Sequence, residues 1–146
     1  MNLARAIEIA VAAHAGQTDK AGAPYILHPL RVMQSLATED ERIVGVLHDL
    51  IEDCPEWTMN RLQQEGFSNH VLSALAAVTK LSDDEPYPDF IARAARDPIA
   101  RRVKRADLID NLDVRRLTEV TEKDARRLNK YLAALAQLDA SHASED

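Results

Sequence analysis

The segment VLHDLIEDC, residues 46–54, places ionisable side chains inside an otherwise apolar run: His48, Asp49, Glu52 and Asp53. In a helix, residues three and four positions apart lie on one face, so these side chains form a single polar wall. Three carboxylates this close repel one another, and holding them in a partly dry cleft is costly. A bound divalent cation would remove that cost, and the segment is therefore a candidate metal site.

The adjacent His–Asp pair supplies one nitrogen and one hard oxygen donor, which suits Mn, Zn, Fe or Ni rather than Ca. Because two ligands rarely suffice, further ligands are expected elsewhere in the chain. His28 in YILHPL follows a loop at an expected helix start, and Asp107 in VKRADLIDNLD lies on an expected helix whose apolar residues face inward. The resulting set has two nitrogen and two oxygen ligands: His28, His48, Asp49 and Asp107. Glu52 and Asp53 would remain beside the metal, where carboxylates activate or orient a water.

Helical periodicity accounts for nearly the whole chain, and no segment alternates convincingly as a strand. The expected helices span about residues 3–14, 29–37, 38–53, 58–67, 69–80, 88–96, 98–117 and 122–140. Only four Gly and six Pro interrupt them. The sequence therefore predicts an all-α fold, a compact bundle of about seven or eight helices. We expect one domain over residues 1–140, followed by a flexible tail at 141–146.

The formal net charge of −6 argues against a surface that binds nucleic acid. An anionic substrate remains compatible, because a metal and local Lys or Arg side chains can reverse the sign inside one cleft. Cys54 is the single cysteine, which excludes an internal disulfide and fits a reducing compartment. No apolar run approaches a membrane span, and the amphipathic N-terminus is typical of a helix rather than a signal peptide. We expect a soluble cytoplasmic protein with a small-molecule partner, binding neither nucleic acid nor a membrane.

Four motifs occur in order over about residues 6–135: AAHAGQTDKAGAPYILHPLRV, GVLHDLIED, AVTKL and VKRADLIDNL. Their arrangement resembles the HD phosphohydrolase superfamily. It is most similar to the hydrolase domain of the RelA/SpoT alarmone enzymes, especially small single-domain alarmone hydrolases of the metazoan SpoT homologue type. The HD dipeptide alone is a weak signal. HD followed by ED, with G-x-PY-x-x-HP upstream and D-x-x-x-N downstream, is a specific one.

The resemblance implies an HD-type helical fold and hydrolysis of the 3′-pyrophosphate of (p)ppGpp, which releases pyrophosphate and GDP or GTP. It implies Mn²⁺ as the metal, bound by the ligand set already named. It assigns Glu52 and Asp53 as the catalytic acidic pair. It also implies a set of substrate-contacting residues: Lys20, Lys80, Asn111, Arg127 and Tyr131.

Two departures from the family pattern concern recognition of the base. Asp19 stands where the family commonly has an Arg that stacks on guanine, and an aspartate cannot make that cation–π contact. The family's D-R-L-H-N-M-R becomes D-L-I-D-N-L-D, which introduces Asp110 and Asp113. An adenosine alarmone, ppApp or pppApp, is therefore an alternative substrate. A different HD phosphohydrolase of a nucleotide or phosphorylated metabolite is a second alternative. A non-catalytic nucleotide sensor is a third, although retention of all ligands and both acids argues against it.

Several polar and aromatic residues also have a structural interpretation. His14 lies on an apolar face and is expected to form a hydrogen bond in the core. Lys80 lies at an expected helix end, where it has two interpretations of nearly equal weight: it complements the helix dipole, or it contacts the substrate. The run RRVKR, residues 101–105, is interpreted as a solvated helix face rather than a phosphate-binding patch. Lys104 is the exception, because it lies one turn before Asp107 and is within reach of the cleft rim. The aromatic residues of PYPDF, residues 86–90, are expected to serve packing.

Overall fold

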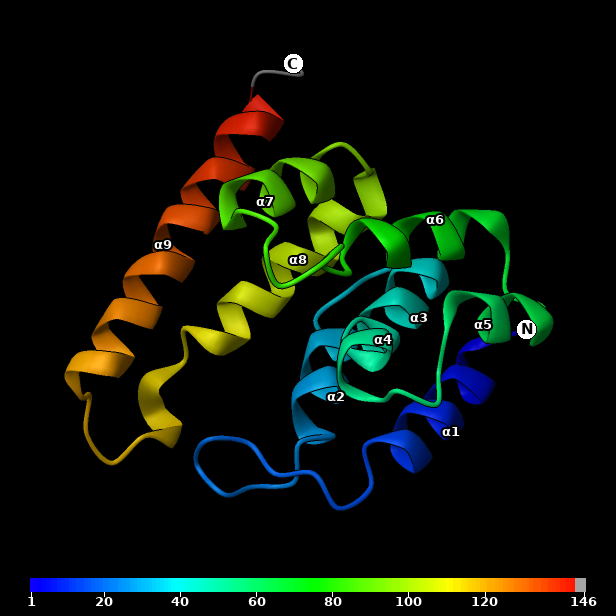
Figure 1. Cartoon of the computed structure of the whole chain (residues 1–146), viewed down its shortest axis with the longest axis horizontal. Helices are drawn as coiled ribbons and strands as arrows, with labels where there is room; N and C mark the ends of the chain where they lie inside the picture. Colours follow the sequence, from blue (N-terminus) through cyan, green and yellow to red (C-terminus); the bar gives the residue numbers. More distant parts are fainter. Residues whose placement is uncertain (144–146) are drawn as a thin grey trace.

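The structure, a computed structural model, describes residues 1–143 and is entirely helical apart from loops and one isolated bridge between Thr18 and Pro24 (Figure 1). Within these residues the helices are α1 (Leu3–Ala13), α2 (Leu27–Gln34), α3 (Glu39–Leu47), α4 (Leu50–Asp53), α5 (Met59–Gln64), α6 (Asn69–Ala77), α7 (Tyr87–Ala95), α8 (Pro98–Asn111), the 3₁₀ helix η1 (Val114–Arg116) and α9 (Glu122–Ala143). None of these described helices combines the length and hydropathy needed to cross a bilayer. The predicted all-α fold is confirmed.

Side-chain caps fix where the two helices that carry most of the site begin. At α3, Thr38 Oγ1 accepts from the Glu41 N–H at 3.2 Å while Glu41 Oε2 accepts from the Thr38 N–H at 3.2 Å, which completes a capping box. At α8, Asp97 Oδ1 accepts from the Ile99 N–H at 2.9 Å, and Pro98 occupies the first helical position. These starts determine which side chains of α3 and α8 face inward.

The prediction of one continuous helix over residues 38–53 is wrong, because α3 ends at Leu47 and α4 begins only at Leu50. Between them Asp49 has φ −100° and ψ 0°, outside the helical minimum. In a continuous helix the Gly45 carbonyl would accept from the Asp49 N–H, but it accepts from His48 Nδ1 at 2.7 Å. The candidate ligands therefore sit at a helix junction rather than on one helix face.

The close approach of α2 to α3 depends on Gly45. A Cβ atom at this position would lie 2.7 Å from Leu36 Cδ1 and 3.4 Å from Met33 Cα. Glycine in a helix interior costs about 1 kcal/mol relative to alanine. Its presence in α3 is therefore explained by the close packing of α2, which carries His28, against α3, which ends just before His48.

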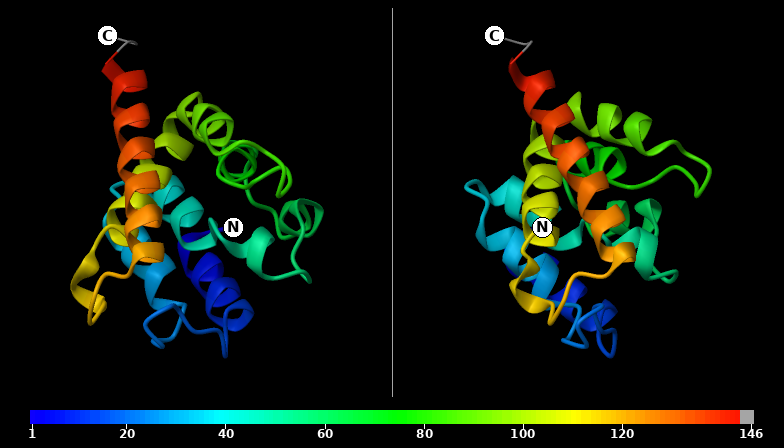
Figure 2. Two further views of the ribbon diagram at one scale, coloured as in Figure 1. Left: turned by 60° about the vertical axis from the view of Figure 1, so that its left-hand side comes forward. Right: turned by 90° about the vertical axis from the view of Figure 1, so that its left-hand side faces the viewer.

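Helix α3 lies at the centre of the fold and packs against α1, α2, α6 and α8. Helix α8 also packs against α7 and α9, so it joins the two halves of the molecule. The larger hydrophobic core surrounds α3, and a second core forms where α7, α8 and α9 meet. The long α9 runs along one side of the molecule beside α8 (Figure 2). The site described below lies where these two halves face each other.

The chain departs from the predicted helix ends after α8 and at the C-terminus. The helix predicted over 98–117 ends at Asn111, because Asp113 accepts from the Arg115 N–H at 3.1 Å and starts the η1 turn. This turn brings Arg116 back to α8. Helix α9 continues through Ala143, beyond the predicted end, and residues 144–146 of the predicted tail lie outside the described residues.

Attachment of α9 should depend on the second core. Leu138 is 1% exposed there, whereas Leu132 on the same helix is 53% exposed. Leu138→Ala should lower the free energy of unfolding by about 2–5 kcal/mol, since it removes buried apolar atoms and leaves a cavity. The control Leu132→Ala should change it by less than about 0.5 kcal/mol. Urea unfolding followed by circular dichroism measures both, and equal losses would contradict the assignment of the core.

Candidate metal centre and substrate cavity

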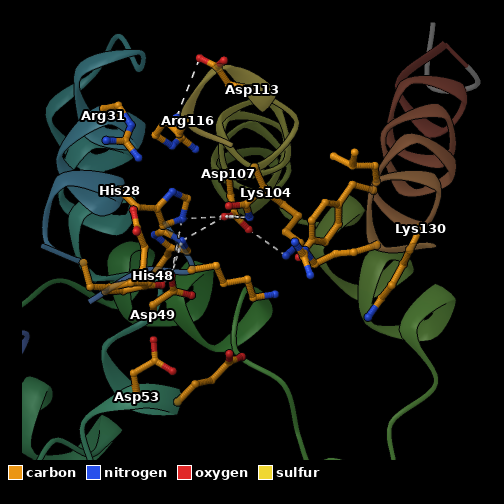
Figure 3. A pocket seen from close by; sticks show the side chains of 18 of the residues that line it. His28, Arg31, His48, Asp49, Asp53, Lys104, Asp107, Asp113, Arg116 and Lys130 are labelled. Carbon is orange, nitrogen blue, oxygen red and sulfur yellow. Dashed lines mark hydrogen bonds and ion pairs between the residues drawn. The ribbon is translucent and has the colours of Figure 1, made fainter. Parts of the chain in front are cut away.

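Three separate segments bring the four predicted ligands together. His28 lies in the first turn of α2, His48 and Asp49 form the junction between α3 and α4, and Asp107 lies in α8. His28 Nε2 is 2.9 Å from Asp107 Oδ1 and 3.7 Å from Asp49 Oδ2. His48 Nε2 is 3.0 Å from Asp49 Oδ2 and 3.4 Å from Asp107 Oδ1. Two imidazole nitrogens therefore face the same two carboxylates (Figure 3).

The donor atoms fit a divalent metal ion. His28, His48 and Asp49 each offer one ligand atom, and these atoms all lie within 4.8 Å of one another. Among the described residues, buried His48 Nε2 has no hydrogen-bond partner of acceptable geometry, although carboxylate oxygens stand beside it. A buried nitrogen without a partner is costly, and a metal ion at this point supplies one. Asp107 Oδ1, close to both imidazoles, is the fourth candidate donor. Imidazole and carboxylate together suit first-row transition metals.

Each imidazole is oriented through its other nitrogen. His48 Nδ1 donates to the Gly45 carbonyl in the last turn of α3 at 2.7 Å. His28 Nδ1 lies 2.6 Å from Asp110 Oδ2, on a different helix. Both contacts leave Nε2 as the atom that faces the carboxylates. Contacts of this kind fix the orientation of metal-binding histidines.

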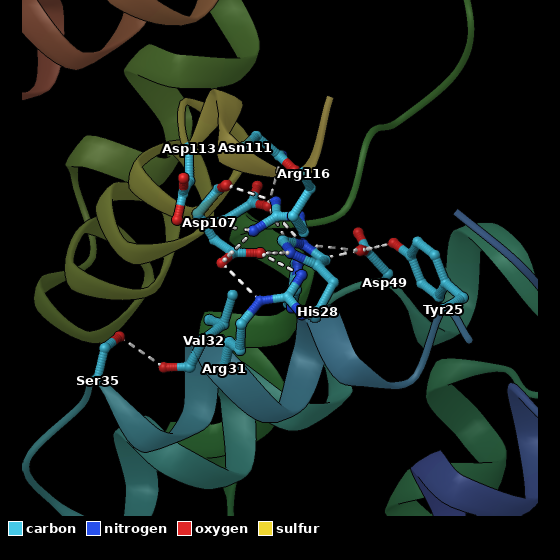
Figure 4. A network of polar contacts seen from close by, with 12 residues as sticks. Tyr25, His28, Arg31, Val32, Ser35, Asp49, Asp107, Asn111, Asp113 and Arg116 are labelled. Atoms are coloured by element: carbon cyan, nitrogen blue, oxygen red, sulfur yellow. Dashed lines mark hydrogen bonds and ion pairs between the residues drawn. The ribbon is translucent and has the colours of Figure 1, made fainter. Parts of the chain in front are cut away.

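The two candidate carboxylate ligands are also held by neighbours. The Tyr25 hydroxyl donates to Asp49 Oδ2, a contact visible in Figure 4. Asn111 Nδ2 donates to Asp107 Oδ1 at 3.1 Å, and Lys104 Nζ donates to Asp107 Oδ2 at 2.9 Å. Asn111 therefore contacts a candidate ligand, in addition to lining the cavity where it was predicted to contact substrate. Each donor limits the rotation of the carboxylate that it contacts.

Opposite charges set the protonation of the centre. Burial lowers the pKa of His28, but the hydrogen bonds to Asp107 and Asp110 outweigh it and raise the pKa above its ordinary value. Burial likewise opposes the charged form of His48, yet Asp49 and Asp107 raise its pKa well above that value. Burial alone would raise the pKa of Asp49, but His48 lowers it to about 2. Protons and a metal ion therefore compete for the same imidazole nitrogens.

The acidic pair of α4 lies next to the candidate ligands and faces the same cavity. Glu52 Oε1 accepts from the Lys80 N–H at 2.7 Å, which leaves Oε2 for a further contact. Partial burial raises the pKa of Glu52, and the Asp49 carboxylate adds to the effect. Burial followed by Asp49 also raises the pKa of Asp53. A carboxylate with a raised pKa is a better proton acceptor, which suits a general base.

A cavity of about 560 Å³ opens over the candidate ligands and the acidic pair. The loop before α2, the loop after α6, α8 and α9 form its walls. These walls include every predicted substrate-contacting residue: Lys20, Lys80, Asn111, Arg127 and Tyr131. Arg127 lies on the cavity wall and is also paired with Asp124 at 2.5 Å. The structure therefore gathers the whole predicted site around one cavity.

Sequence reasoning missed Lys130. It placed Lys104 within reach of the cleft rim, because that residue lies one turn before Asp107. In the structure the Lys104 side chain is 12% exposed and paired with Asp107. Lys130 enters the cavity wall from α9 (Figure 3). Its Nζ lies 4.0 Å from the centroid of the Tyr87 ring. Tyr87 packs against the second core, as predicted, and also lines the cavity.

His14 occupies the core, as predicted from its position on an apolar face. It is 1% exposed, and its Nδ1 lies 2.8 Å from Gln17 Oε1. It does not line the cavity. Not every histidine near the centre therefore belongs to the candidate ligand set.

Comparison with known proteins places this arrangement in a family. The HD domain family matches residues 6–137. A probable GTP pyrophosphokinase of Mycobacterium leprae is 34% identical over 92% of this chain and 18% of its own length. A guanosine-3′,5′-bis(diphosphate) 3′-pyrophosphohydrolase of Aquifex aeolicus is 34% identical over 74% of this chain and 17% of its own length. A bifunctional (p)ppGpp synthase/hydrolase RelA of Mycobacterium tuberculosis is 34% identical over 93% of this chain and 20% of its own length.

The chain thus spans about a fifth or less of the length of these relatives. The match to the HD domain covers the segments that bring the His and Asp side chains together. The chain belongs to the HD domain family, and the relatives it resembles there are of the RelA/SpoT type.

Proposed function

We propose that this chain is a divalent-metal-dependent hydrolase that removes the 3′-pyrophosphate of a purine alarmone, (p)ppGpp or (p)ppApp. The products would be pyrophosphate and the nucleoside 5′-diphosphate or triphosphate. The observation that carries the proposal is the convergence of two His, two Asp and an acidic pair at one cavity with lysines on its walls. Relatives named for ppGpp hydrolysis support the substrate class. We propose Mn²⁺ as the metal.

His28, His48, Asp49 and Asp107 would hold the ion. A bound divalent ion supplies Lewis acidity toward a phosphoryl oxygen and lowers the pKa of water. Glu52 Oε2 accepts the proton of the water that attacks the 3′-phosphorus, while Oε1 stays bonded to Lys80 N–H. Asp53 orients the same water. As the bond between phosphorus and the ribose 3′ oxygen breaks, that oxygen gains a proton, which balances the one lost by the water.

Lysines on the cavity walls stabilise the phosphoryl charge. Burial lowers the pKa of Lys130, and the nearby ammonium groups of Lys80 and Lys104 lower it further. A bound polyphosphate relieves this repulsion, because each ammonium then faces an anion. Within the described residues, neither Lys80 nor Lys130 has a carboxylate partner within ion-pair distance. Both are therefore available to a substrate, even though the chain as a whole is acidic.

Base recognition has to proceed without the stacking Arg of the family pattern. Asp19 Oδ1 accepts from the N–H groups of Ala21 and Ala23, each at 2.9 Å, so this carboxylate shapes its own loop. The loop presents Lys20 to the cavity, opposite α9. We therefore propose both the guanosine and the adenosine alarmones as substrates.

We also propose a cytoplasmic location, in line with the buried free thiol of Cys54.

The function is tested by incubating the purified protein with Mn²⁺ and, in parallel, ppGpp, ppApp, dGTP and GMP. We expect release of pyrophosphate from one or both alarmones, measured by an enzyme-coupled assay and by chromatography of the nucleotide product. Release of phosphate or triphosphate from dGTP or GMP alone would contradict the proposal and indicate a different HD phosphohydrolase. Alarmone binding without turnover would indicate a nucleotide sensor.

Metal affinity should rise with pH. Because the pKa values of His28 and His48 are raised, both imidazoles stay protonated at pH values above the ordinary histidine range. Each must lose one proton to bind metal. Affinity should therefore fall roughly tenfold for each pH unit below a histidine pKa. Calorimetric titration with Mn²⁺ between pH 6 and pH 9 measures the profile. His48→Asn should abolish tight binding, whereas exposed His70→Asn should reproduce the wild-type curve. An affinity independent of pH would contradict this assignment.

Glu52→Gln should lower kcat by about 10²–10⁴-fold, because the amide cannot accept the water proton. Its carbonyl oxygen can still accept from Lys80 N–H, so the local fold and Mn²⁺ affinity should be retained. The matched control is Glu56→Gln at an exposed position outside the cavity, which should leave kcat unchanged. Full turnover by Glu52→Gln with metal bound would refute its role as the base.

A further inference from the structure

We propose that Asp110 is the positioning residue for the candidate ligand His28. In this view Asp110 holds the proton of the imidazole on Nδ1 and thereby directs the Nε2 lone pair toward the metal position. Arg31 and Arg116 in turn fix the Asp110 carboxylate. The inference rests on the proposed metal centre but does not depend on which substrate the cavity accepts.

The contact between Asp110 and His28 defines the tautomer. His28 Nδ1 lies 2.6 Å from Asp110 Oδ2, and both side chains are largely buried, at 7% and 11% exposure respectively. An ionised carboxylate only accepts hydrogen bonds, so the proton must lie on Nδ1. The neutral imidazole then has its lone pair on Nε2, the atom that faces Asp49 and Asp107.

Two arginines hold Asp110 in this position. Arg31 donates through Nε to Oδ1 at 2.8 Å and through Nη2 to Oδ2 at 3.0 Å, a bidentate pair. Arg116 Nη1 lies 3.5 Å from Asp110 Oδ1, and Arg116 Nη2 donates to the Asp110 carbonyl at 2.8 Å. Both carboxylate oxygens are therefore engaged, and rotation away from His28 would break several charged contacts. Figure 4 shows Arg31 and Arg116 beside His28.

The arrangement is built from two helix faces that meet. His28 and Arg31 lie three residues apart on α2, and Asp107 and Asp110 lie three residues apart on α8. Residues with this spacing share a face of a helix. One pair of contacts joins His28 to both aspartates, and another joins Arg31 to Asp110. The face of α8 that carries the candidate ligand Asp107 thus also carries Asp110, which orients the candidate ligand His28 on α2.

The orientation of the His28 ring depends on a side chain from another helix, whereas that of the His48 ring depends on a nearby backbone carbonyl. His48 Nδ1 donates to a backbone carbonyl in the last turn of α3, a neutral acceptor that persists whenever α3 forms. His28 has an ionised side-chain acceptor from α8 instead. A carboxylate acceptor makes an imidazole a more basic ligand and fixes its ring plane. Loss of Asp110 should therefore weaken metal binding through His28 while leaving His48 unaffected.

The test compares Asp110→Asn with Asp113→Asn. Asp113 also lines the cavity and pairs with Arg115 and Arg116, but it makes no contact with His28. An asparagine there can still accept from the Arg115 N–H that starts η1, so Asp113→Asn is a control with the same change in charge. We expect Asp110→Asn to lower Mn²⁺ affinity by about 10–100-fold, the range for loss of such partners. Asp113→Asn should stay within about twofold of wild type. Calorimetric titration well below the unfolding temperature measures both.

A second readout reports the tautomer directly. In the Zn²⁺-loaded protein, ¹⁵N-edited NMR should show a hydrogen-bonded Nδ1–H of His28 in wild type and in Asp113→Asn. In Asp110→Asn this signal should shift or broaden. Arg31→Lys retains the charge but loses the bidentate contact, so it should give an intermediate loss of Mn²⁺ affinity. This variant replaces Asp110→Asn as the test if Asp110→Asn does not fold.

Unchanged Mn²⁺ affinity and an unchanged Nδ1–H signal in Asp110→Asn, even with a lower unfolding temperature, would overturn the proposal. Asp110 would then only tether α8 to α2. If Asp110→Asn fails to fold, wild-type affinity in Arg31→Lys would overturn it equally. Neither measurement uses an alarmone, so a negative hydrolysis assay leaves this test intact.

Discussion

The facing of two imidazoles and two carboxylates at the centre is the interaction on which the rest of the structure depends. Burying these groups separately would be costly, because ionised side chains lose their hydration. Placed together, each imidazole nitrogen lies next to carboxylate oxygens. Three local features bring these groups together: the glycine that lets α2 approach α3, the interruption after Leu47, and the capped start of α8. The apolar cores hold these three segments in register.

Charge is divided across the cavity in a way that suits an anionic substrate. The candidate ligands and the acidic pair occupy one side, where a cation is needed. Lysines from the loop after α6, from α8 and from α9 occupy the walls nearby. A chain with net charge −6 therefore still offers a local cationic surface. Lys104 connects the two regions, because it contacts Asp107 and also lines the cavity.

The sequence predicted the candidate ligands His48 and Asp49 and the acidic pair because ionisable residues at this spacing are unusual in an apolar segment. His28 and Asp107 were candidates because a metal needs more than two ligands, and the structure brings all four side chains together. The sequence did not predict the helix junction, since the break depends on His48 taking the Gly45 carbonyl and on Tyr25 reaching Asp49 from a distant loop. The run around Lys104 looked solvated because it is basic, and the burial of Lys104 depends on which helices cover α8. Local periodicity gives the face of a residue, whereas the partner on that face comes only from the tertiary fold.

Asp110 shows why single departures from a family pattern are hard to interpret alone. An aspartate one turn after Asp107 places two carboxylates on one helix face, where they repel. The repulsion is relieved because His28 bridges the two, with Nε2 toward Asp107 and Nδ1 toward Asp110, and because Arg31 pairs with Asp110. To bind His28, a metal ion has to displace only the proton on its Nε2. The contact with Asp110 can persist, so the carboxylate that helps to balance the metal-free centre can also direct the imidazole toward the ion.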